Sequence, residues 1–146
     1  MKIQIDVDPA YDDIHIKIEC GKLTPEIDRM ISLIRMLDMQ IPAKKNGETY
    51  LIDAAKLLYV EAVERTTFLY TEDNVYESDL KLYELEQQLT ERGFLRISKQ
   101  TLVHLKKIKS LKADLNRKIR VTLCNGEQIM VSRMYADEFR KRIGIK

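Results

Sequence analysis

The sequence predicts a mainly β fold with short helices, of the α+β class, preceded by a small β-hairpin and a helix. Short runs rich in β-branched and aromatic residues recur from Glu48 onward, and such runs are typical of strands. Turn signals separate the runs, and Asn125-Gly126 is the clearest of them. Apolar residues at helical spacing occur in only a few stretches. A chain of 146 residues can bury one core and carry an appended subdomain.

The first segment predicts a hairpin. Residues 2–7 and 13–19 alternate apolar and polar side chains with period two, which is the pattern of strands with one buried face. Asp8-Pro9 begins a cluster of turn-forming residues between the two runs. We therefore expect two paired strands, the second of which ends at Gly21.

A helix is expected over residues 25–38. Thr24 can cap it, Pro25 suits its first turn, and the acidic residues Glu26 and Asp28 complement its dipole. Its apolar side chains cover more than the single stripe that a lone surface helix buries. Part of this apolar surface is therefore expected to meet another subunit; its residues are Ile27, Met30, Ile31, Ile34 and Leu37.

Residues 41–47 contain Pro42 and Asn46-Gly47, and this composition is typical of a linker. We place a boundary there, which gives a subdomain over residues 1–46 and a second module over residues 47–146. In the second module, the expected strands span residues 49–53, 57–61, 67–71, 74–78, 101–103, 108–113, 118–123 and 128–131. The expected helices span residues 80–89 and 134–143.

Charge is divided unevenly along the chain. Up to Glu91 there are 10 Lys and Arg against 19 Asp and Glu, a net charge of −9, whereas from Arg92 onward there are 15 against 4, a net charge of +11. A concentration of positive charge favours polyanions, because each phosphate that Lys or Arg neutralises releases condensed counterions. The alternative is a basic face that is only solvated.

Several classes of protein are not indicated. No apolar run is long enough to cross a bilayer, and the first residues do not form a signal peptide, so we expect a cytoplasmic protein. Cys20 and Cys124 are isolated, so neither a disulfide framework nor a metal site is expected. Cys124 with His104 is the one pair to consider for thiol catalysis, but nothing near Cys124 would activate it. We expect no enzyme activity, no cofactor and no small-molecule substrate.

Four segments of the second module form a pattern by their order and spacing. They are Leu58-Tyr59-Val60-Glu61-Ala62, residues 80–89, Phe94-Leu95-Arg96-Ile97 and residues 123–133. Together they resemble the LytTR DNA-binding domain of bacterial transcription regulators, over roughly residues 48–143. The resemblance implies an antiparallel β fold that lays loops, rather than a recognition helix, into successive major grooves and bends the DNA.

By this resemblance, the base-reading loops are residues 63–67, residues 98–100 and Ser132-Arg133. An arginine such as Arg133 can donate two hydrogen bonds to guanine, Gln100 can pair with adenine, and Lys99 can serve guanine or a phosphate. A surface ion pair is the alternative for Arg133. The expected base contacts are Arg133, Lys99, Gln100, Thr67 and Thr66, and the expected phosphate contacts are Arg65, Arg96, Ser98, Lys106, Lys107 and Lys118.

Two points in this assignment stay open. Arg96 lies in an apolar context, so an orienting ion pair is as good an interpretation as a phosphate contact. The middle loop also departs from the family, because Ser98, Gln100 and His104 stand where members usually have His, Ser and Asn. The DNA sequence read by this loop therefore cannot be carried over from relatives. His104 itself is expected to be a structural histidine.

The segment before Asn46 is too short for a receiver domain, so we expect no phosphorelay input. Short regulators of this type resemble proteins that a neighbouring membrane protein sequesters. The apolar helix surface is then a homodimer contact or the docking site of such an inhibitor, or it packs on its own β domain. Two functions remain: a sequence-specific DNA-binding regulator acting as two copies on repeated half-sites, and an interaction or oligomerisation module whose basic face binds an acidic protein.

Overall fold

The computed structural model of the chain describes residues 1–12, 14–36 and 39–145, without the side chains of Arg35 and Met36. Over these residues the α-helices are α1 (Pro25–Met36), α2 (Leu82–Leu89) and α3 (Arg133–Ile143). The strands are β1 (Gln40–Lys45), β2 (Glu48–Asp53), β3 (Tyr59–Val63), β4 (Thr66–Tyr70), β5 (Val75–Ser78), β6 (Phe94–Ser98), β7 (Thr101–His104), β8 (Ile108–Ala113), β9 (Ile119–Leu123) and β10 (Gln128–Val131). Short 3-10 turns, η3 (Leu105–Lys107) and η4 (Leu115–Arg117), flank β8.

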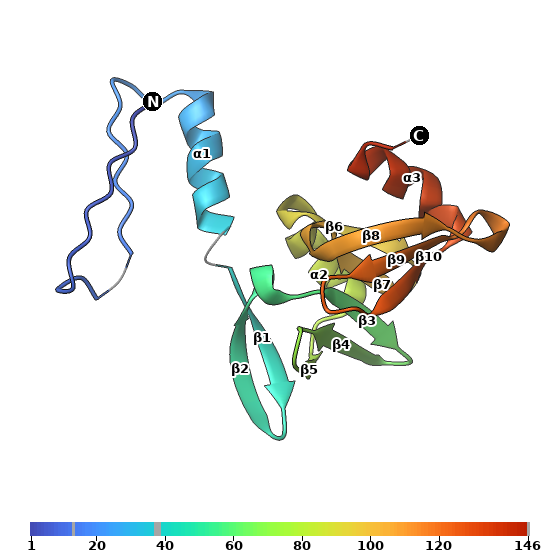
Figure 1. Cartoon of the computed structure of the whole chain (residues 1–146). Helices are drawn as coiled ribbons and strands as arrows, with labels where there is room; N and C mark the ends of the chain where they lie inside the picture. The colour runs from blue at the N-terminus through green and yellow to red at the C-terminus, as the bar shows by residue number, and fades with distance from the viewer. Residues whose placement is uncertain (13, 37–38, 146) are drawn as a thin grey trace.

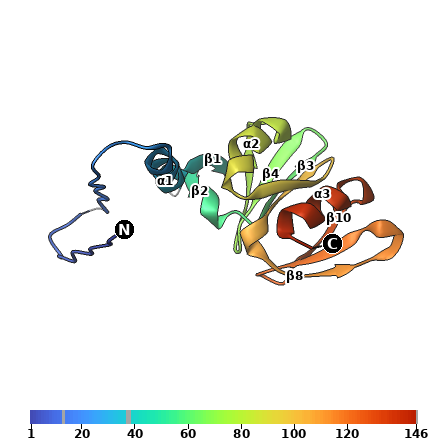
Figure 2. The same cartoon turned by 90° about the horizontal axis from the view of Figure 1, so that it is seen from above.

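The strands form two antiparallel sheets arranged as layers. In the described residues, the large sheet has the strand order β2-β1-β5-β4-β3-β7-β6, and the small sheet has the order β10-β9-β8. Helix α2 covers one face of the large sheet, and the small sheet with α3 covers part of the other face (Figures 1 and 2). The mainly β fold with short helices that the sequence predicts is confirmed.

Strand alternation sends neighbouring residues of the large sheet into two separate cores. Val60 and Leu102 point to the α2 side, whereas the adjacent Tyr59 and Val103 point to the side of the small sheet and α3. This is the two-residue period of a pleated strand. Because both faces of β3, β6 and β7 are buried, these strands form the centre of the molecule.

Most of the expected strands of the second module are present, with ends shifted by one or two residues. The sequence pattern does not predict strand β6 (Phe94–Ser98). Its residues Phe94, Leu95 and Ile97 are all buried, on both faces of the sheet. A strand buried on both faces does not alternate in polarity, so its sequence lacks the signal on which the other predictions depended.

The linker predicted over residues 41–47 is wrong. Strand β1 occupies this stretch and pairs with β2 along its whole length, and Ile41 and Ala43 lie in the core under α2. Pro42 is tolerated because β1 pairs with β5 at Lys44 and not at Pro42, so the missing amide proton costs no bond there. Asn46 and Gly47 both have positive φ, 53° and 80°, as a tight hairpin turn requires. A boundary at residue 46 thus falls inside the β1–β2 hairpin.

The hairpin predicted over residues 2–7 and 13–19 is also wrong as regular structure, because the described residues of this segment form no strand. Its apolar side chains find little to pack against: Ile3, Ile5 and Ile14 are 80%, 79% and 85% exposed. A two-stranded ribbon without a packed face is marginal in water. The alternation in the sequence is real, but nothing described in this chain buries it.

Helix α1 begins as predicted. The Thr24 hydroxyl accepts a hydrogen bond from the Ile27 amide at 3.3 Å, which caps the first turn. Leu37 and Asp38, the last residues of the expected helix, lie outside the described residues. Neither buried core contains a residue of α1, and Figures 1 and 2 show the helix standing beside the β domain rather than over it. Packing of this helix on its own β domain is therefore not what the structure shows.

His104 is a buried structural histidine, as expected. Its side chain is 5% exposed, its Nδ1 lies 2.8 Å from the Leu57 carbonyl oxygen, and its ring stacks on Phe94 with the centroids 4.4 Å apart. Burial lowers the pKa of the imidazole below its ordinary value of 6.5, against a smaller opposite effect of the Leu57 hydrogen bond. The neutral ring is therefore the form that the fold favours.

Acid should destabilise the protein through His104. The unfolded chain binds a proton at this ring more readily than the folded chain, so the free energy of unfolding is expected to fall as pH drops through 6.5. An asparagine can keep the hydrogen bond to Leu57 without titrating, so His104→Asn should lose this component. Urea unfolding across that pH range measures the effect, with the exposed His15→Asn as control. Equal pH dependence in His104→Asn and the unmodified protein would contradict the assignment.

Helix α3 should depend on one aromatic anchor. Phe139 is fully buried against the small sheet, so Phe139→Ala is expected to cost about 3–5 kcal/mol of unfolding free energy. Met134 lies on the same helix and is 79% exposed, so Met134→Ala should change stability by no more than about 0.5 kcal/mol. Denaturant titration of both variants checks this, and similar losses would refute the anchor role.

Candidate nucleic-acid interface

Two backbone hydrogen bonds bring distant turns to one end of the molecule. The Ala62 amide at the end of β3 donates to the Gln100 carbonyl in the β6–β7 turn, at 2.8 Å. The Ser132 amide, just before α3, donates to the Ile97 carbonyl of β6, also at 2.8 Å. The β3–β4 turn, the β6–β7 turn and the start of α3 are therefore held around the end of β6.

A surface depression lies at this end of the molecule, and none of its lining residues comes from the β3–β4 turn. It lies between the β6–β7 turn, the β8–β9 turn and the first turn of α3. Three basic side chains from these three elements reach it, namely Lys99, Lys118 and Arg133. The remaining lining residues are Ser98, Gln100, Asn116, Ser132, Met134 and Tyr135. The structure thus brings together candidate residues that lie as far apart in the sequence as Ser98 and Arg133.

A side-chain hydrogen bond holds the β6–β7 turn in a shape that leaves its tip exposed. The Ser98 hydroxyl accepts a hydrogen bond from the Gln100 amide at 3.2 Å, which is a side-chain turn of the kind that serine favours. Lys99 and Gln100 are both exposed at the tip. Ser98 therefore holds the turn in shape, while its two neighbours are free to reach a ligand.

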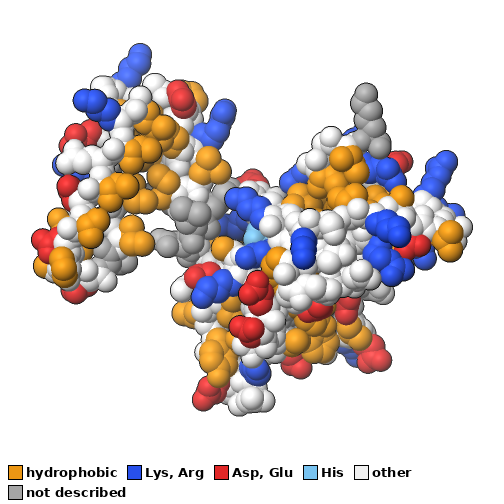
Figure 3. All heavy atoms as spheres, viewed as in Figure 1, with side chains coloured by type: hydrophobic (Ala, Val, Ile, Leu, Met, Phe, Trp, Pro, Cys, Tyr) orange, Lys and Arg blue, Asp and Glu red, His pale blue; other side chains and the backbone are white. Residues whose placement is uncertain are grey.

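The basic residues of the depression carry uncompensated charge. Lys99, Lys118 and Arg133 make no ion pair or hydrogen bond with any other side chain among the described residues. Arg120, by contrast, is held by Asp114 in an ion pair of 2.9 Å. The alternative role of Arg133 as half of a surface ion pair is not seen. Figure 3 shows Lys and Arg gathered over the side of the molecule that carries the small sheet and α3, with more Asp and Glu below it.

The candidate residues of the β3–β4 turn do not all lie on the same face of the large sheet. Arg65 is exposed at the turn, next to Glu64, whose φ is 57°. Thr66 is half-buried, but Thr67 is only 5% exposed, since it lies on the α2 face of the sheet. Thr67 therefore cannot reach a base in this structure, and the alternation of the strand is the reason.

Arg96 forms a loose ion pair and does not line the depression. Its Nε lies 3.7 Å from the Glu86 Oε1 of α2, and its side chain is 24% exposed. Arg96 belongs to the same face of β6 as Phe94, which packs under α2. The side chain therefore points away from the depression, and the prediction of a phosphate contact for Arg96 is not supported.

Lys106 and Lys107 are not part of the depression either. They lie in η3, at the start of β8, whereas Lys118 lies beyond its other end. The length of β8 separates the two ends by about 17 Å, at about 3.4 Å per residue. The Lys107 carbonyl instead accepts a bond from the Cys124 amide beside the β9–β10 turn, at 2.8 Å. These two lysines were grouped with Lys118 only because they share one hairpin.

Asn116 and Tyr135 line the depression but were not singled out in the sequence. Asn116 sits in the β8–β9 turn with a positive φ of 58°. Its signal was available, because an asparagine between two strands is typical of a left-handed turn position. Tyr135 had no such signal, since an aromatic residue at the start of a helix is equally typical of a core.

Among the described residues, no helix combines the length and the hydrophobicity that a membrane span requires. No group of three or more His, Cys, Asp and Glu residues in the described part of the chain is placed to hold a metal ion.

Comparison with known proteins assigns the domain. Residues 47–144 match the family model described as the LytTr DNA-binding domain. A solved LytTr DNA-binding domain from Bacillus cereus superposes with a TM-score of 0.70 at 26% identity, over 74% of this chain and 99% of that one. The match therefore covers the layered β domain and the depression, and it begins inside the β1–β2 hairpin.

The chain is also similar in sequence to proteins described as transcriptional regulators and sensory transduction proteins. An uncharacterised HTH-type transcriptional regulator of Staphylococcus aureus is 24% identical over 99% of both chains. The sensory transduction protein LytT of Enterococcus faecalis is 27% identical over 72% of this chain, which spans only 43% of that protein's length. The two sheets, the helices between their strands and the family match over residues 47–144 lead to one assignment: the chain belongs to the LytTr DNA-binding domain family.

Proposed function

We propose that this chain is a cytoplasmic transcription regulator that binds specific duplex DNA by inserting loops into the major groove. The observation that carries the proposal is the depression in which Lys99, Lys118 and Arg133 meet without ionic partners among the described residues. Phosphates would compensate this charge on binding. The neighbouring Gln100 and Arg133 can pair bidentately with bases.

The contacts divide into two kinds. Arg133, Lys99 and Gln100 project from turns or a helix start, so they can enter a groove and read base edges. Thr66 is half-buried on the β3–β4 hairpin, outside the depression, and would add a hydroxyl contact. Ser98 and Lys118 line the same depression, and Arg65 is exposed at the β3–β4 turn. These three are better suited to fix the protein on the backbone of the DNA.

Control of the regulator is proposed to work without phosphorylation of this chain. The described residues before β1 form an irregular segment and α1, rather than the doubly wound sheet of a receiver domain. Helix α1 instead offers the half-buried apolar residues Ile27, Met30, Ile31 and Ile34. We propose that this surface joins two copies on repeated half-sites, and a membrane-protein inhibitor would compete for it.

A mobility-shift titration over a salt series tests the function. The duplex is one selected from random DNA by the purified protein, and a scrambled duplex is the competitor. Binding is expected to survive excess competitor, and log affinity should fall linearly with log salt. If an acidic protein were the true ligand, the selection would return no preferred sequence.

Single substitutions should separate base reading from backbone anchoring. Arg133→Ala is expected to lose about 1–3 kcal/mol of preference for the selected duplex. Lys118→Ala should weaken binding to both duplexes about equally, because a phosphate contact is independent of sequence. Lys106→Ala, at the far end of β8, is the matched control and should have little effect. The assignment fails if Arg133→Ala and Lys118→Ala behave alike.

A charge placed on α1 should disrupt self-association. Ile34 is half-buried on its apolar face and Ser32 is exposed on the same helix. Ile34→Glu is expected to shift sedimentation velocity toward the monomer, because an unpaired carboxylate would be buried in the interface. Ser32→Glu adds the same charge and should leave the dimer intact. A protein that sediments as a monomer at all concentrations would rule out the dimer.

A further inference from the structure

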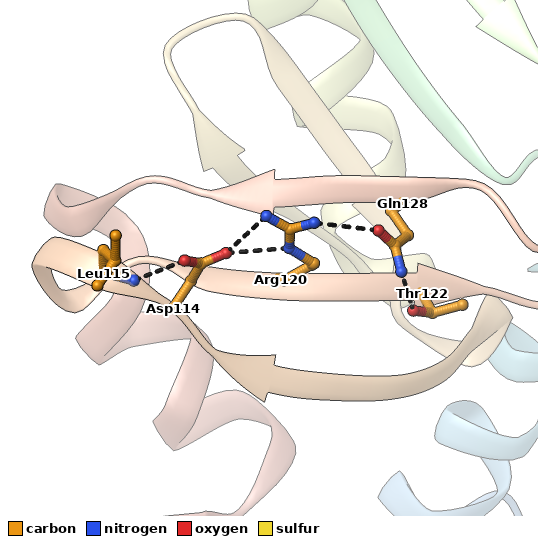
Figure 4. A network of polar contacts seen from close by, with 5 residues as sticks. All are labelled: Asp114, Leu115, Arg120, Thr122 and Gln128. Atoms are coloured by element: carbon orange, nitrogen blue, oxygen red, sulfur yellow. Dashed lines mark hydrogen bonds and ion pairs between the residues drawn. The ribbon is translucent and has the colours of Figure 1, made fainter.

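The β8–β9 turn is a rigid, charged projection that the function described so far uses only through Lys118. Its base is locked by Asp114, which accepts a bond from the Leu115 amide at 2.7 Å and from Arg120 Nε at 2.9 Å. Arg120 also bonds Gln128 of β10 at 3.3 Å. Figure 4 shows this network along the hairpin. The hydrogen bonds from Leu115 and Arg120 hold the pKa of the Asp114 carboxyl below its ordinary value, so the lock is charged at neutral pH.

Beyond this lock, the backbone takes an unfavourable shape. Asn116 and Arg117 have consecutive positive φ angles of 58° and 63°. Asparagine tolerates this region, but arginine does not favour it. An asparagine or glycine at position 117 would suit the local backbone better than the arginine that is there. The fold of the turn therefore does not explain the presence of a guanidinium at this position.

Residues of the turn line two depressions. Asn116 and Lys118 line the depression that also contains Lys99 and Arg133. Arg117 lines a second depression, formed with the first turns of α3. Arg133 belongs to both. The basic surface therefore continues past Arg133, from the candidate base-reading turn to Arg117.

The second depression is cationic and suited to an oxyanion. Its lining is Arg117, Arg133, Ala136, Asp137 and Arg140. It contains three guanidinium groups and one carboxylate, and the Arg117 side chain makes no ion pair or hydrogen bond with another described residue. Guanidinium forks match the geometry of phosphate oxygens.

We propose that Arg117 binds a backbone phosphate of the DNA in this second depression, beside Arg133, which makes the β8–β9 turn a further DNA-contacting element. This inference rests on the proposed DNA-binding function and adds a residue to it. A phosphate contact positions the duplex without reading its sequence. It would fix the DNA strand next to the groove that Arg133 enters, so that the two arginines set the register together.

The test uses the full chain with Arg117→Asn. Fluorescence anisotropy with the selected and scrambled duplexes over a salt series should show about tenfold weaker binding to both, and a salt slope smaller by about 0.9. The melting temperature should stay the same or rise, because asparagine suits a left-handed backbone. Arg117→Lys keeps the charge and should retain the salt slope. Lys109→Gln, which removes one charge on β8, is the matched control and should leave binding nearly unchanged.

The outcomes separate this inference from the proposed function. Unchanged binding by Arg117→Asn, with the unmodified protein still binding DNA, overturns the inference alone. Loss of preference for the selected duplex would make Arg117 a base contact and also overturn it. A lower melting temperature for Arg117→Asn would assign the residue a structural role instead. If the unmodified protein binds neither duplex, the proposed function fails and the phosphate site fails with it.

Discussion

Burial of β3, β6 and β7 on both faces is the constraint on which the rest of the structure depends. Their alternate residues supply two cores, one closed by α2 and the other by the small sheet with α3. Each strand is thereby fixed in register, because a slip by one residue would exchange the two cores. The ends of these strands are therefore fixed in position, and they hold the turns that follow them in place. A surface built from turns needs such support to present side chains in one arrangement.

The candidate interface follows from how the strands end. The Ala62–Gln100 and Ser132–Ile97 backbone bonds hold the β3–β4 turn, the β6–β7 turn and the start of α3 around the end of β6. The β8–β9 turn adds Lys118 to the depression that Lys99 and Arg133 line. Repulsion among Lys99, Lys118 and Arg133 is the cost of this arrangement, and nothing described in the chain relieves it. Such charge is more easily understood as complementary to a polyanion than as a contribution to stability. The matching family is a DNA-binding domain, so DNA is the polyanion that the match indicates.

The structure also sorts residues that looked alike in the sequence. Arg96, Arg120 and Arg133 are all basic residues of the C-terminal half, yet Glu86 holds the first, Asp114 holds the second, and the third is left without a partner among the described residues. Lys107 and Lys118 belong to the same hairpin but lie at opposite ends of it. Composition could show that the C-terminal half was basic, but not which of its cations were already neutralised.

The sequence by itself determined the fold class and the family, because periodicity, turn residues and motif order are local properties of a chain. The resemblance also predicted three loops as the interface, and Lys99, Gln100 and Arg133 lie on two of them. Prediction from the sequence failed where local signals were absent or misleading. Strand β6 has no alternation, because both its faces are buried. Strand β1 contains Pro42 and is followed by Asn46-Gly47, a composition that is also typical of a linker. Only the tertiary structure decided that Thr67 and Arg96 face away from the interface, that Lys106 lies beyond it, and that Asn116 and Arg117 lie within reach of Arg133. Those facts depend on which face of a sheet a residue occupies and on pairing between strands far apart in the chain, and both are set by packing rather than by neighbouring residues.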